Sequence, residues 1–450
     1  GIKKPSDYSE SKVKNILKNG ELGEDKTYQS KKKDEDQDHP NILFLQLESF
    51  IDPTQVKGFS YSKDPIPNYR KLMKEYSSGY LTVPSVGAGT ANTEFESMTG
   101  ISVKFFGPGE YPYKSVLLER TCESIPYDLK NMGYSTHAIH NHRGAFYGRN
   151  KVFRNLGFDT FTSLEYMNNV VKTPKNWAKD GLLTDQIMDA MQSTEGRDYV
   201  YTISVQGHGK YPSEQMLEDP EITVTEAPSE ERKWQYEYYV NQVYEMDQFV
   251  KDLTDRLSEF DEDVVLVMYG DHLPALDMTE EDMKNGDLFA TQYIIWDNFG
   301  MKKQDKNLAS YEIGAEVLDR LGIHDGLLTT YHQNYEDSDT YLQDLETLAY
   351  DMLYGEDYIY GGTSPFKPTD MKMGVKDIKI KDIVQIGEDY YIKGENFTEY
   401  SKISLDGEVL DTIYLGPTIL GLKEEVNPAD VSRMKISQVE KNKEILSTTE

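Results

Sequence analysis

Four apolar runs of strand length in this chain each end in side chains that can bind a metal ion or a phosphate. They are Ile42 to Leu47 ending at Glu48, Tyr134 to Ile139 ending at His140, Tyr199 to Val205 ending at Gly207-His208, and Val264 to Tyr269 ending at Gly270-Asp271-His272. Apolar runs of this length are typical of strands buried on both faces. Because open α/β folds keep their ligands at the carboxyl edge of the sheet, we expect one site assembled from these four strand ends.

Stretches with helical periodicity lie between the apolar runs, so strands and helices alternate from Pro40 to about Gly362. The predicted helices are Tyr69 to Glu75, Cys122 to Met132, Leu182 to Met191, Tyr236 to Phe260 and Tyr341 to Leu353. This alternation is the βαβ pattern of a mostly parallel sheet with helices on both faces. The sequence therefore predicts an α/β domain over residues 40–365.

The pattern changes after the segment from Thr363 to Pro368. Short alternating strands are predicted at Ile378 to Ile380, Tyr390 to Ile392 and Ile403 to Leu405, followed by the hairpin signal Asp406-Gly407. Residues 370–450 are thus expected to form a small all-β module, whose segments 394–398 and 402–407 resemble immunoglobulin-like IPT/TIG modules. Residues 1–39 are expected to be a charged, mostly unpacked lead-in with one helix around Ser9 to Asn19.

Composition narrows the classes of function. The chain has 450 residues, with 48 Lys and Arg against 78 Asp and Glu, which gives a formal charge of -30. The negative electrostatic field of such a chain disfavours binding to nucleic acid. The single cysteine, Cys122, excludes an internal disulfide and a cysteine-based zinc cluster. The sequence contains no apolar stretch long enough to span a bilayer, and its polar start is what either an excised extracellular domain or an ordinary tail would have.

A glycine-rich loop, Val86 to Thr90, places a hydroxyl residue where a helix from Ala91 to Met98 is expected to begin. Free backbone N–H groups at a helix start favour an anion such as phosphate. Thr90 is therefore a candidate nucleophile beside a phosphate site. The alternative is that Thr90 or Asn92 only caps the helix.

These motifs occur together in the order found in one family. Gln46 to Ser49, the Gly-x-Gly-Thr-x-x-x-Glu-Phe loop, His140 with Arg149 nine residues later, Gln206-Gly207-His208 and Tyr269 to His272 resemble lipoteichoic acid synthase-like proteins over about residues 40 to 360. Those proteins are phosphoglycerol transferases of the alkaline phosphatase/sulfatase superfamily. The resemblance implies the sulfatase/alkaline phosphatase-like form of the α/β fold for residues 40–365.

By this resemblance one divalent metal ion is held by four residues: Glu48, Thr90, Asp271 and His272. In the family the ion is typically Mn²⁺, and two carboxylates, an imidazole and an alkoxide also suit Mg²⁺ or Zn²⁺. A metal ion at the Thr90 oxygen would lower its pKa and make it a competent nucleophile. The alternatives are a surface carboxylate for Glu48 and a polar turn after a strand for Asp271-His272.

The resemblance also assigns substrate contacts to His140, Arg149 and His208. A planar guanidinium suits a phosphodiester, and the imidazoles could hold phosphoryl oxygens or exchange protons with hydroxyl groups. Structural histidines and a solvated arginine are the alternatives. This chain has His142 where the family often has an acid and Tyr147 where it often has a tryptophan, which leaves recognition of the head group open.

The function implied by the resemblance is that of the extracellular catalytic domain of a bacterial membrane enzyme. It would take glycerol phosphate from phosphatidylglycerol through a threonyl intermediate and pass it to a polyglycerolphosphate or glycolipid acceptor. We expect a monomer that binds no nucleic acid, anchored by transmembrane helices outside this chain. The rival functions are a phosphodiesterase, a sulfatase, for which a Cys/Ser-x-Pro-x-Arg motif is missing, a phosphoethanolamine transferase, and a degenerate cell-wall binding protein.

Overall fold

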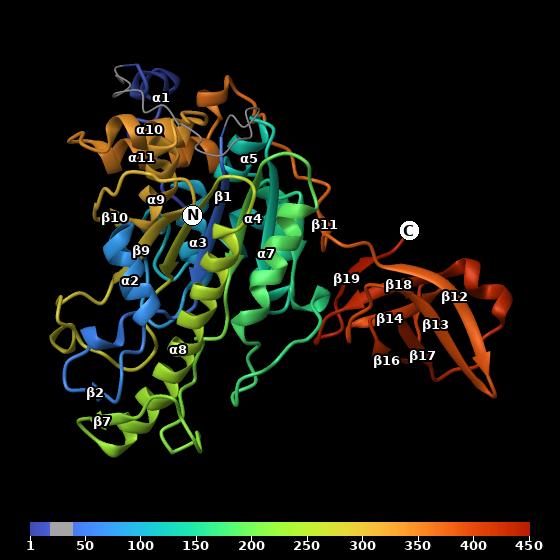
Figure 1. The fold of residues 1–450 in the computed structure, drawn as a ribbon. Coiled ribbons are helices and arrows are strands. Elements are labelled where there is room, and N and C mark those ends of the chain that lie inside the picture. Colours follow the sequence, from blue (N-terminus) through green and yellow to red (C-terminus); the bar gives the residue numbers. More distant parts are fainter. Residues whose placement is uncertain (19–38) are drawn as a thin grey trace.

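A nine-stranded sheet forms the centre of the protein in the computed structural model, which describes residues 1–18 and 39–450 (Figure 1). The strands in spatial order are β10 (Leu308–Ala309), β3 (Ser77–Thr82), β9 (Ala290–Asp297), β8 (Val264–Gly270), β1 (Asn41–Leu47), β6 (Asp198–Ile203), β4 (Ser135–His140), β5 (Thr160–Thr162) and β11 (Lys372–Met373). Only β9 runs against its neighbours. The predicted α/β fold with a mostly parallel sheet is confirmed.

The four apolar runs noted in the sequence are β8, β1, β6 and β4, and they are adjacent in the sheet. All four are parallel, and every residue of β1, β6 and β8 is buried. Their carboxyl ends therefore meet at one edge, which puts Glu48, His140 and Asp271 in the same region of the molecule.

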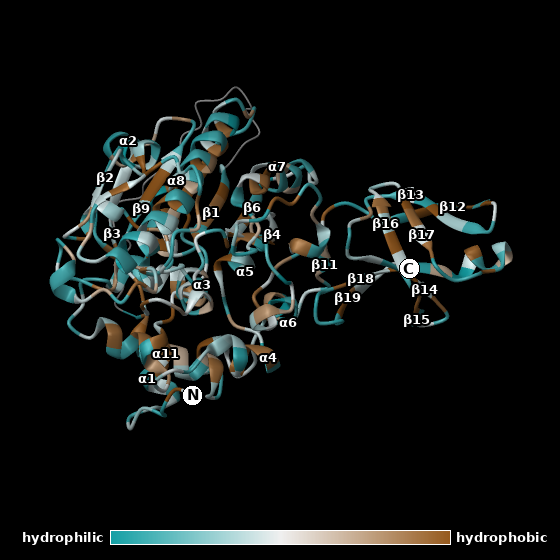
Figure 2. Cartoon of the chain, turned by 90° about the horizontal axis from the view of Figure 1, so that it is seen from below, coloured by the Kyte–Doolittle hydropathy of each residue, from teal (hydrophilic) through white to brown (hydrophobic). Residues whose placement is uncertain are grey.

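Side chains alternate between the two faces of the sheet. Ile42 and Phe44 of β1 belong to one apolar core, whereas Leu43 and Leu45 belong to the other. The first core is covered by α1 (Glu10–Ile16), α3 (Thr90–Thr99), α4 (Val116–Glu119), α5 (Ile125–Lys130), α6 (Arg149–Asn155), α9 (Ser310–Arg320), α10 (Leu327–Tyr335) and α11 (Tyr341–Leu353). The second is covered by α2 (Pro67–Glu75), α7 (Leu183–Gln192) and α8 (Glu230–Ser258). Figure 2 shows brown, apolar segments inside this body and teal segments at its periphery.

Two predicted helices begin three or more residues away from their predicted starts, for local reasons. The helix expected from Cys122 begins at Ile125, because Ser124 takes the cap position and its hydroxyl accepts the N–H of Tyr127. Helix α8 begins at Glu230, six residues before the predicted Tyr236. The apolar pattern did not indicate these residues, because the first turn of the helix is polar. A Ser229 cap starts this helix.

The lead-in was expected to be mostly unpacked, and for residues 1–18 this is wrong. Helix α1 lies at Glu10–Ile16, capped by Ser9, and buries Val13 and Ile16 in the first apolar core together with Ile2. Two apolar side chains one turn apart are enough to dock a short helix on an existing core. The remainder of the predicted lead-in, residues 19–38, lies outside the described residues.

The C-terminal part forms the predicted all-β module. One sheet has the order β12 (Lys379–Ile386), β13 (Asp389–Glu395), β17 (Ile419–Leu422) and β16 (Thr412–Gly416). The other has the order β15 (Glu408–Val409), β14 (Ser401–Leu405), β18 (Met434–Val439) and β19 (Ile445–Thr448), with Asp406-Gly407 at the β14–β15 turn. The module has its own core around Ile392, Phe397 and Ile436. A further two-stranded ribbon pairs β2 (Ser60–Tyr61) with β7 (Val224–Glu226).

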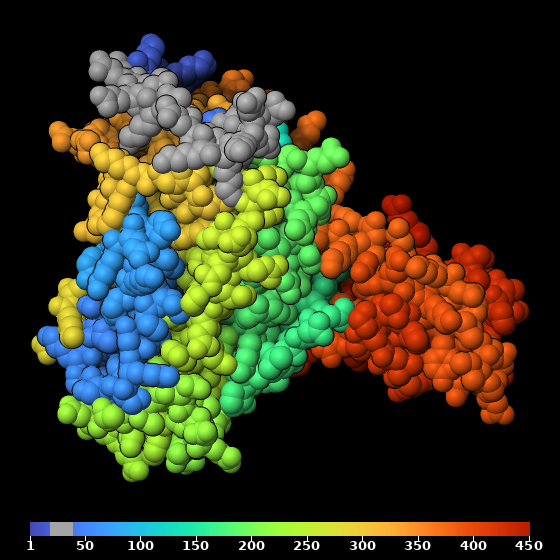
Figure 3. All heavy atoms as spheres, in the orientation of Figure 1, coloured from blue at the N-terminus to red at the C-terminus, as the bar shows by residue number. Residues whose placement is uncertain are grey.

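The module joins the α/β domain along one side (Figure 3). The Thr398 hydroxyl donates to the Glu165 carbonyl at 2.6 Å, and Arg143 forms an ion pair with Glu440 at 2.6 Å. The module is therefore held by specific polar contacts as well as by the chain connection. In the described part of the chain, no helix has both the length and the apolar composition needed to cross a bilayer.

Candidate active site

Two glycines let the segment after β1 approach the neighbouring strand ends. A Cβ atom at Gly207 would lie 2.1 Å from the Glu48 carbonyl oxygen, and one at Gly270 would lie 1.9 Å from that of Phe50. Ser49 between them has a positive φ of 52°. Only glycine permits such close backbone approach, so the glycines in Gln-Gly-His and Gly-Asp-His bring Glu48 against the other two motifs.

Thr90 is the first residue of α3, and its side chain does not cap the helix. Gly89, with φ of 93°, occupies the cap position, and no side chain accepts a hydrogen bond there. The helix-cap alternative for Thr90 and Asn92 is therefore wrong. The Thr90 hydroxyl instead donates to Glu48 Oε2 at 2.9 Å and lies 3.5 Å from His272 Nε2.

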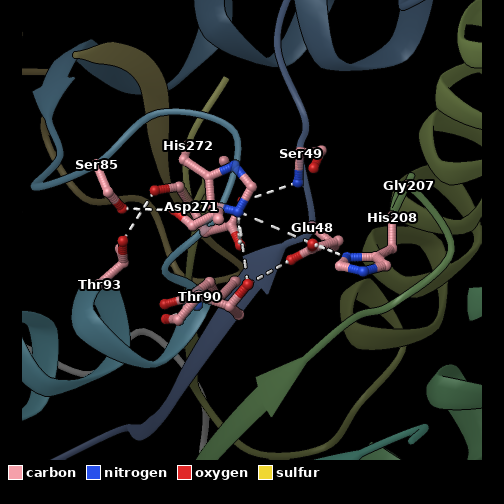
Figure 4. A network of polar contacts seen from close by, with 12 residues as sticks. Glu48, Ser49, Ser85, Thr90, Thr93, Gly207, His208, Asp271 and His272 are labelled. Carbon is pink, nitrogen blue, oxygen red and sulfur yellow. Dashed lines mark hydrogen bonds and ion pairs between the residues drawn. The ribbon is translucent and has the colours of Figure 1, made fainter. Parts of the chain in front are cut away.

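Three of the predicted metal ligands come together beside Thr90 (Figure 4). Ligand atoms of Glu48, Asp271 and His272 lie within 4.8 Å of one another, and all three residues are buried. His272 Nδ1 donates to the Leu273 carbonyl at 2.8 Å. This hydrogen bond leaves the lone pair on Nε2, which lies 3.3 Å from Asp271 Oδ2 and 3.9 Å from Glu48 Oε1.

The donor set fits a divalent cation. Asp271 Oδ1 accepts the N–H of Ser49 at 2.8 Å, but Oδ2 is buried without a hydrogen-bond partner. Burial and the negative charge of Glu48 raise the pKa of Asp271 well above its usual value. Burial also acts to raise the pKa of Glu48, but its interactions with Asp271 and His208 outweigh this effect and lower that pKa. A cation would neutralise these neighbouring carboxylates, and two carboxylates, an imidazole and a hydroxyl are suitable ligands for it.

His208 lies at the open side of this cluster. Its Nδ1 contacts Glu48 Oε1 at 2.6 Å, and its side chain is 43% exposed. The ring packs edge-on against Trp177, with 4.4 Å between ring centroids. Burial lowers the pKa of His208, but the bond to Glu48 outweighs it and raises that pKa overall. His208 is thus fixed through one nitrogen and free to meet a ligand through the other.

His140 is held in one orientation at the end of β4. Its Nδ1 donates to the Ile203 carbonyl at 2.7 Å. Burial and then the charge of Arg149 keep its pKa well below the usual value, so the ring is neutral with a lone pair on Nε2. The neighbouring His142 contacts Trp177, with ring centroids 5.3 Å apart. These aromatic rings form a wall beside the cluster.

Arg149 is anchored to the helix that carries Thr90. Its Nε and Nη2 donate to the two carboxylate oxygens of Glu94 at 3.1 and 2.6 Å, and both side chains are fully buried. Glu94 lies four residues after Thr90 on α3, hence on the same face. Arg149 Nη1 is buried without a partner. The guanidinium therefore keeps one unused donor for an incoming anion.

The structure brings together Glu48, Thr90, Asp271, His272 and His208 by direct contacts, and it places His140 and Arg149 next to them through Ile203 and Glu94. Their functional roles stay predictions. Sequence reasoning gave no role to Glu94 and missed Trp177. The spacing of Thr90 and Glu94 could have indicated the first, whereas nothing in the loop sequence around Trp177 signals its contact with His208.

Comparisons with known proteins identify a family and similar folds. A family model described as Sulfatase matches residues 40–323. A Rhizobium meliloti (strain 1021) protein, provisionally named for cyclic β-1,2-glucan modification, is 27% identical over 361 residues, which are 71% of this chain and 55% of that protein. This chain thus spans about half the length of that relative.

Two solved structures have a similar fold. The Streptococcus pyogenes phosphoglycerol transferase GacH, in complex with sn-glycerol-1-phosphate, is 20% identical with a TM-score of 0.66, covering 82% of this chain and 100% of that one. The lipoteichoic acid synthase LtaP from Listeria monocytogenes is 18% identical with a TM-score of 0.55, covering 72% and 81%. The predicted membership of the sulfatase family and the sulfatase/alkaline phosphatase-like fold are confirmed.

Proposed function

The chain belongs to the sulfatase family, and from that premise we propose that it transfers glycerol phosphate from phosphatidylglycerol to a cell-envelope polymer. The observation that carries this proposal is the Thr90 hydroxyl. It is freed from helix capping and lies 2.9 Å from Glu48 within a cluster of buried carboxylate and imidazole groups. A hydroxyl in such a setting is suited to attack phosphorus.

One divalent cation, Mn²⁺ first and Mg²⁺ or Zn²⁺ as alternatives, would be held by Glu48, Thr90, Asp271 and His272. When bound it would supply positive charge beside the Thr90 oxygen and the phosphoryl group. The support in this chain is the unpartnered Asp271 Oδ2 and the lone pair that His272 Nε2 directs toward the carboxylates.

In the first step the Thr90 oxygen forms a bond to phosphorus as the bond from phosphorus to the diacylglycerol oxygen breaks. Thr90 releases its proton along the hydrogen bond it now makes to Glu48. His208, through the nitrogen not used by Glu48, donates a proton to the diacylglycerol oxygen. The product is a phosphodiester of Thr90 with glycerol.

In the second step an acceptor hydroxyl attacks the same phosphorus and the bond to Thr90 breaks. His208 takes the proton of the acceptor hydroxyl, and Thr90 regains its own. Throughout, Arg149 Nη1 donates to a non-bridging phosphoryl oxygen and His140 Nε2 accepts from a glycerol hydroxyl, since both atoms are unused beside the cluster.

The same proposal includes the place of action. The donor is a membrane lipid, so we place this domain on the outer side of a bacterial cell membrane, with anchoring helices outside the present chain. The acceptor is a polyglycerolphosphate or a glycolipid. If water takes its place, the same steps make the protein a phosphodiesterase.

Intact-mass spectrometry after incubation with phosphatidylglycerol and Mn²⁺ tests the proposal. The expected result is a glycerol-phosphate adduct that maps to Thr90, with release of diacylglycerol. The matched Thr90→Ala protein should carry no adduct. An adduct at another residue would overturn the assignment of the nucleophile. If the protein stays unmodified and no diacylglycerol is released with any of the metal ions, the transferase proposal is overturned. An adduct that decays as fast in water alone as it does with an acceptor would favour the phosphodiesterase.

A further inference from the structure

A cavity lies between the α/β domain and the C-terminal module. It has a volume of about 700 Å³ and is bounded by α7, α8, the loop 168–171, the connecting segment 374–378 and Asn396 of the module. This volume is within the usual range for ligand sites, which often lie at domain boundaries. In Figure 1 the module stands beside α7 at this junction.

The floor of the cleft is built from two matching helical stripes. Helix α8 contributes Glu245, Gln248, Phe249 and Asp252, and α7 contributes Leu182, just before its first turn, with Asp185, Gln186 and Asp189. Both sets have the spacing i, i+3, i+4, i+7 of one helix face. Such a face at a domain junction is normally apolar, but here six of the eight side chains are polar. The stripes are therefore arranged for a polar ligand.

Several of these polar groups are not used by the fold. Among the described residues, Asn169, Gln186 and Gln248 have no side-chain hydrogen-bond partner, although each lines the cleft. A primary amide offers both donors and acceptors, as a hydroxyl group does. These amides therefore match the hydroxyl groups of a sugar chain.

The charges of the cleft disfavour an anionic polymer. Four carboxylates line it against two lysines, Lys179 and Lys376. Lys179 is paired with Glu245 at 2.6 Å and Lys376 with Asp189 at 3.2 Å, so neither lysine is available for a phosphate without losing its partner. A polyglycerolphosphate chain would meet net negative charge here, whereas a neutral glycan would not.

The cleft and the candidate active site share two chain segments. Lys179 lines the cleft, and Trp177, two residues earlier, packs on His208. Gln206 lines the cleft as well, and its backbone and side chain are fixed by Asp180 and Glu245 just before Gly207-His208. Two residues of extended chain span about 7 Å, so a ligand in the cleft lies close behind the wall of the site.

We infer that this cleft binds a neutral, hydroxyl-rich glycan, held by the amides of α7 and α8, as the acceptor chain of the enzyme. The acceptor role rests on the proposed function, whereas glycan binding itself does not. The chemistry excludes the polyglycerolphosphate acceptor from this cleft in favour of the carbohydrate one.

Equilibrium binding measured without lipid donor separates the two proposals. The full chain is titrated with a short neutral gluco-oligosaccharide and, separately, with a glycerol-phosphate oligomer, by calorimetry and saturation-transfer NMR. The test variant is Gln186→Ala with Gln248→Ala, and Gln192→Ala, an exposed amide at the end of α7 outside the cleft, is its matched control. Gln248→Trp, which fills the cleft from an exposed position, is a second test variant.

The neutral oligosaccharide should bind the wild type and the Gln192→Ala control equally. Both test variants should bind about tenfold more weakly or worse, because each hydrogen bond to a neutral group is worth up to about one factor of ten. Diacylglycerol release with water as acceptor should be unchanged in the test variants, while any stimulation by the oligosaccharide should be lost. Tighter binding of the glycerol-phosphate oligomer, no binding of either ligand, or unaltered binding by folded test variants would each overturn the inference, whatever the lipid assay shows.

Discussion

Replacing Thr90 separates the chemistry of the candidate site from its contribution to stability. Thr90→Ala removes the oxygen that donates to Glu48 at 2.9 Å and one buried methyl group. A hydrogen bond to a charged group contributes about 1.5 to 3 kcal/mol and a buried methyl about 0.8 kcal/mol. Because Glu48 keeps its contact with His208, we expect the low end of this sum, about 2 kcal/mol, and a folded protein.

Activity should respond on a much larger scale. Loss of a nucleophile typically lowers turnover by a factor on the order of 10⁴ to 10⁶, which far exceeds any effect of 2 kcal/mol on the folded fraction. Thr90→Ser keeps the oxygen but frees the side-chain rotation that a β-branched residue restricts. We therefore expect serine to retain turnover within about a hundredfold of wild type.

A fluorescent phosphatidylglycerol analogue and a thermal melt, applied to the same preparations, measure both quantities. Thr99→Ala is the matched control, since Thr99 is a buried threonine of the same helix whose hydroxyl bonds to the Phe95 carbonyl at 2.7 Å. It should lose a similar amount of stability and keep its turnover. A folded Thr90→Ala protein with turnover near wild type, or an inactive Thr99→Ala protein with a normal melt, would refute the reasoning.

Four further results are expected. Asp271→Asn should weaken Mn²⁺ binding by at least tenfold in calorimetry, since it removes the charge of the unpartnered Oδ2; unchanged affinity would remove Asp271 from the ligand set. Arg149→Lys should lower turnover about a hundredfold, because an ammonium cannot hold Glu94 through two atoms and still present a free donor; wild-type kinetics would show that the two-nitrogen contact of Arg149 with Glu94 is not needed. A chain ending at residue 374 should fold and bind Mn²⁺, whereas one ending at residue 369 should melt lower because it lacks β11, the partner of β5; identical melts would contradict this. Burial raises the pKa of Glu96 to about 7, above the unfolded value of about 4.3, so stability should fall as pH rises through that window; a Glu96→Gln protein with the same pH dependence would disprove the assignment.

The sequence predicted the centre of the fold because that centre has the simplest physical signature. Strands β8 and β1 are covered on both faces, so their residues are almost continuously apolar, and the shared direction of β8, β1, β6 and β4 brings the ends of these strands to one edge. Strand β3, near one edge of the sheet, carries no such signal. β3 contains Ser77, Ser78 and Gly79 and was not predicted, since its pairing with β9 depends on partners distant in sequence.

The candidate site could be predicted in composition but not in geometry. The motifs named the groups that meet, because a carboxylate, a hydroxyl and an imidazole at strand ends indicate metal and phosphate chemistry. They could not indicate that Glu94 would engage two nitrogens of Arg149 and leave the third free. Nor could they place Trp177 on His208, since that contact depends on how a loop folds back over the sheet edge.

Helix α3 links these features mechanically. It carries Thr90 at its first residue and Glu94 one turn later, so the proposed nucleophile and the carboxylate that holds Arg149 are fixed on one rigid element. Gln46 of β1 donates to the Thr90 carbonyl at 3.1 Å, and the Thr93 hydroxyl donates to the Asp271 carbonyl at 2.9 Å. The helix is thus tied to two strands of the sheet at its first turn. A shift of α3 would move the nucleophile and the arginine together, so the geometry between them would stay constant. The distances from Thr90 to Glu48 and Asp271 would then be the quantities most sensitive to distortion.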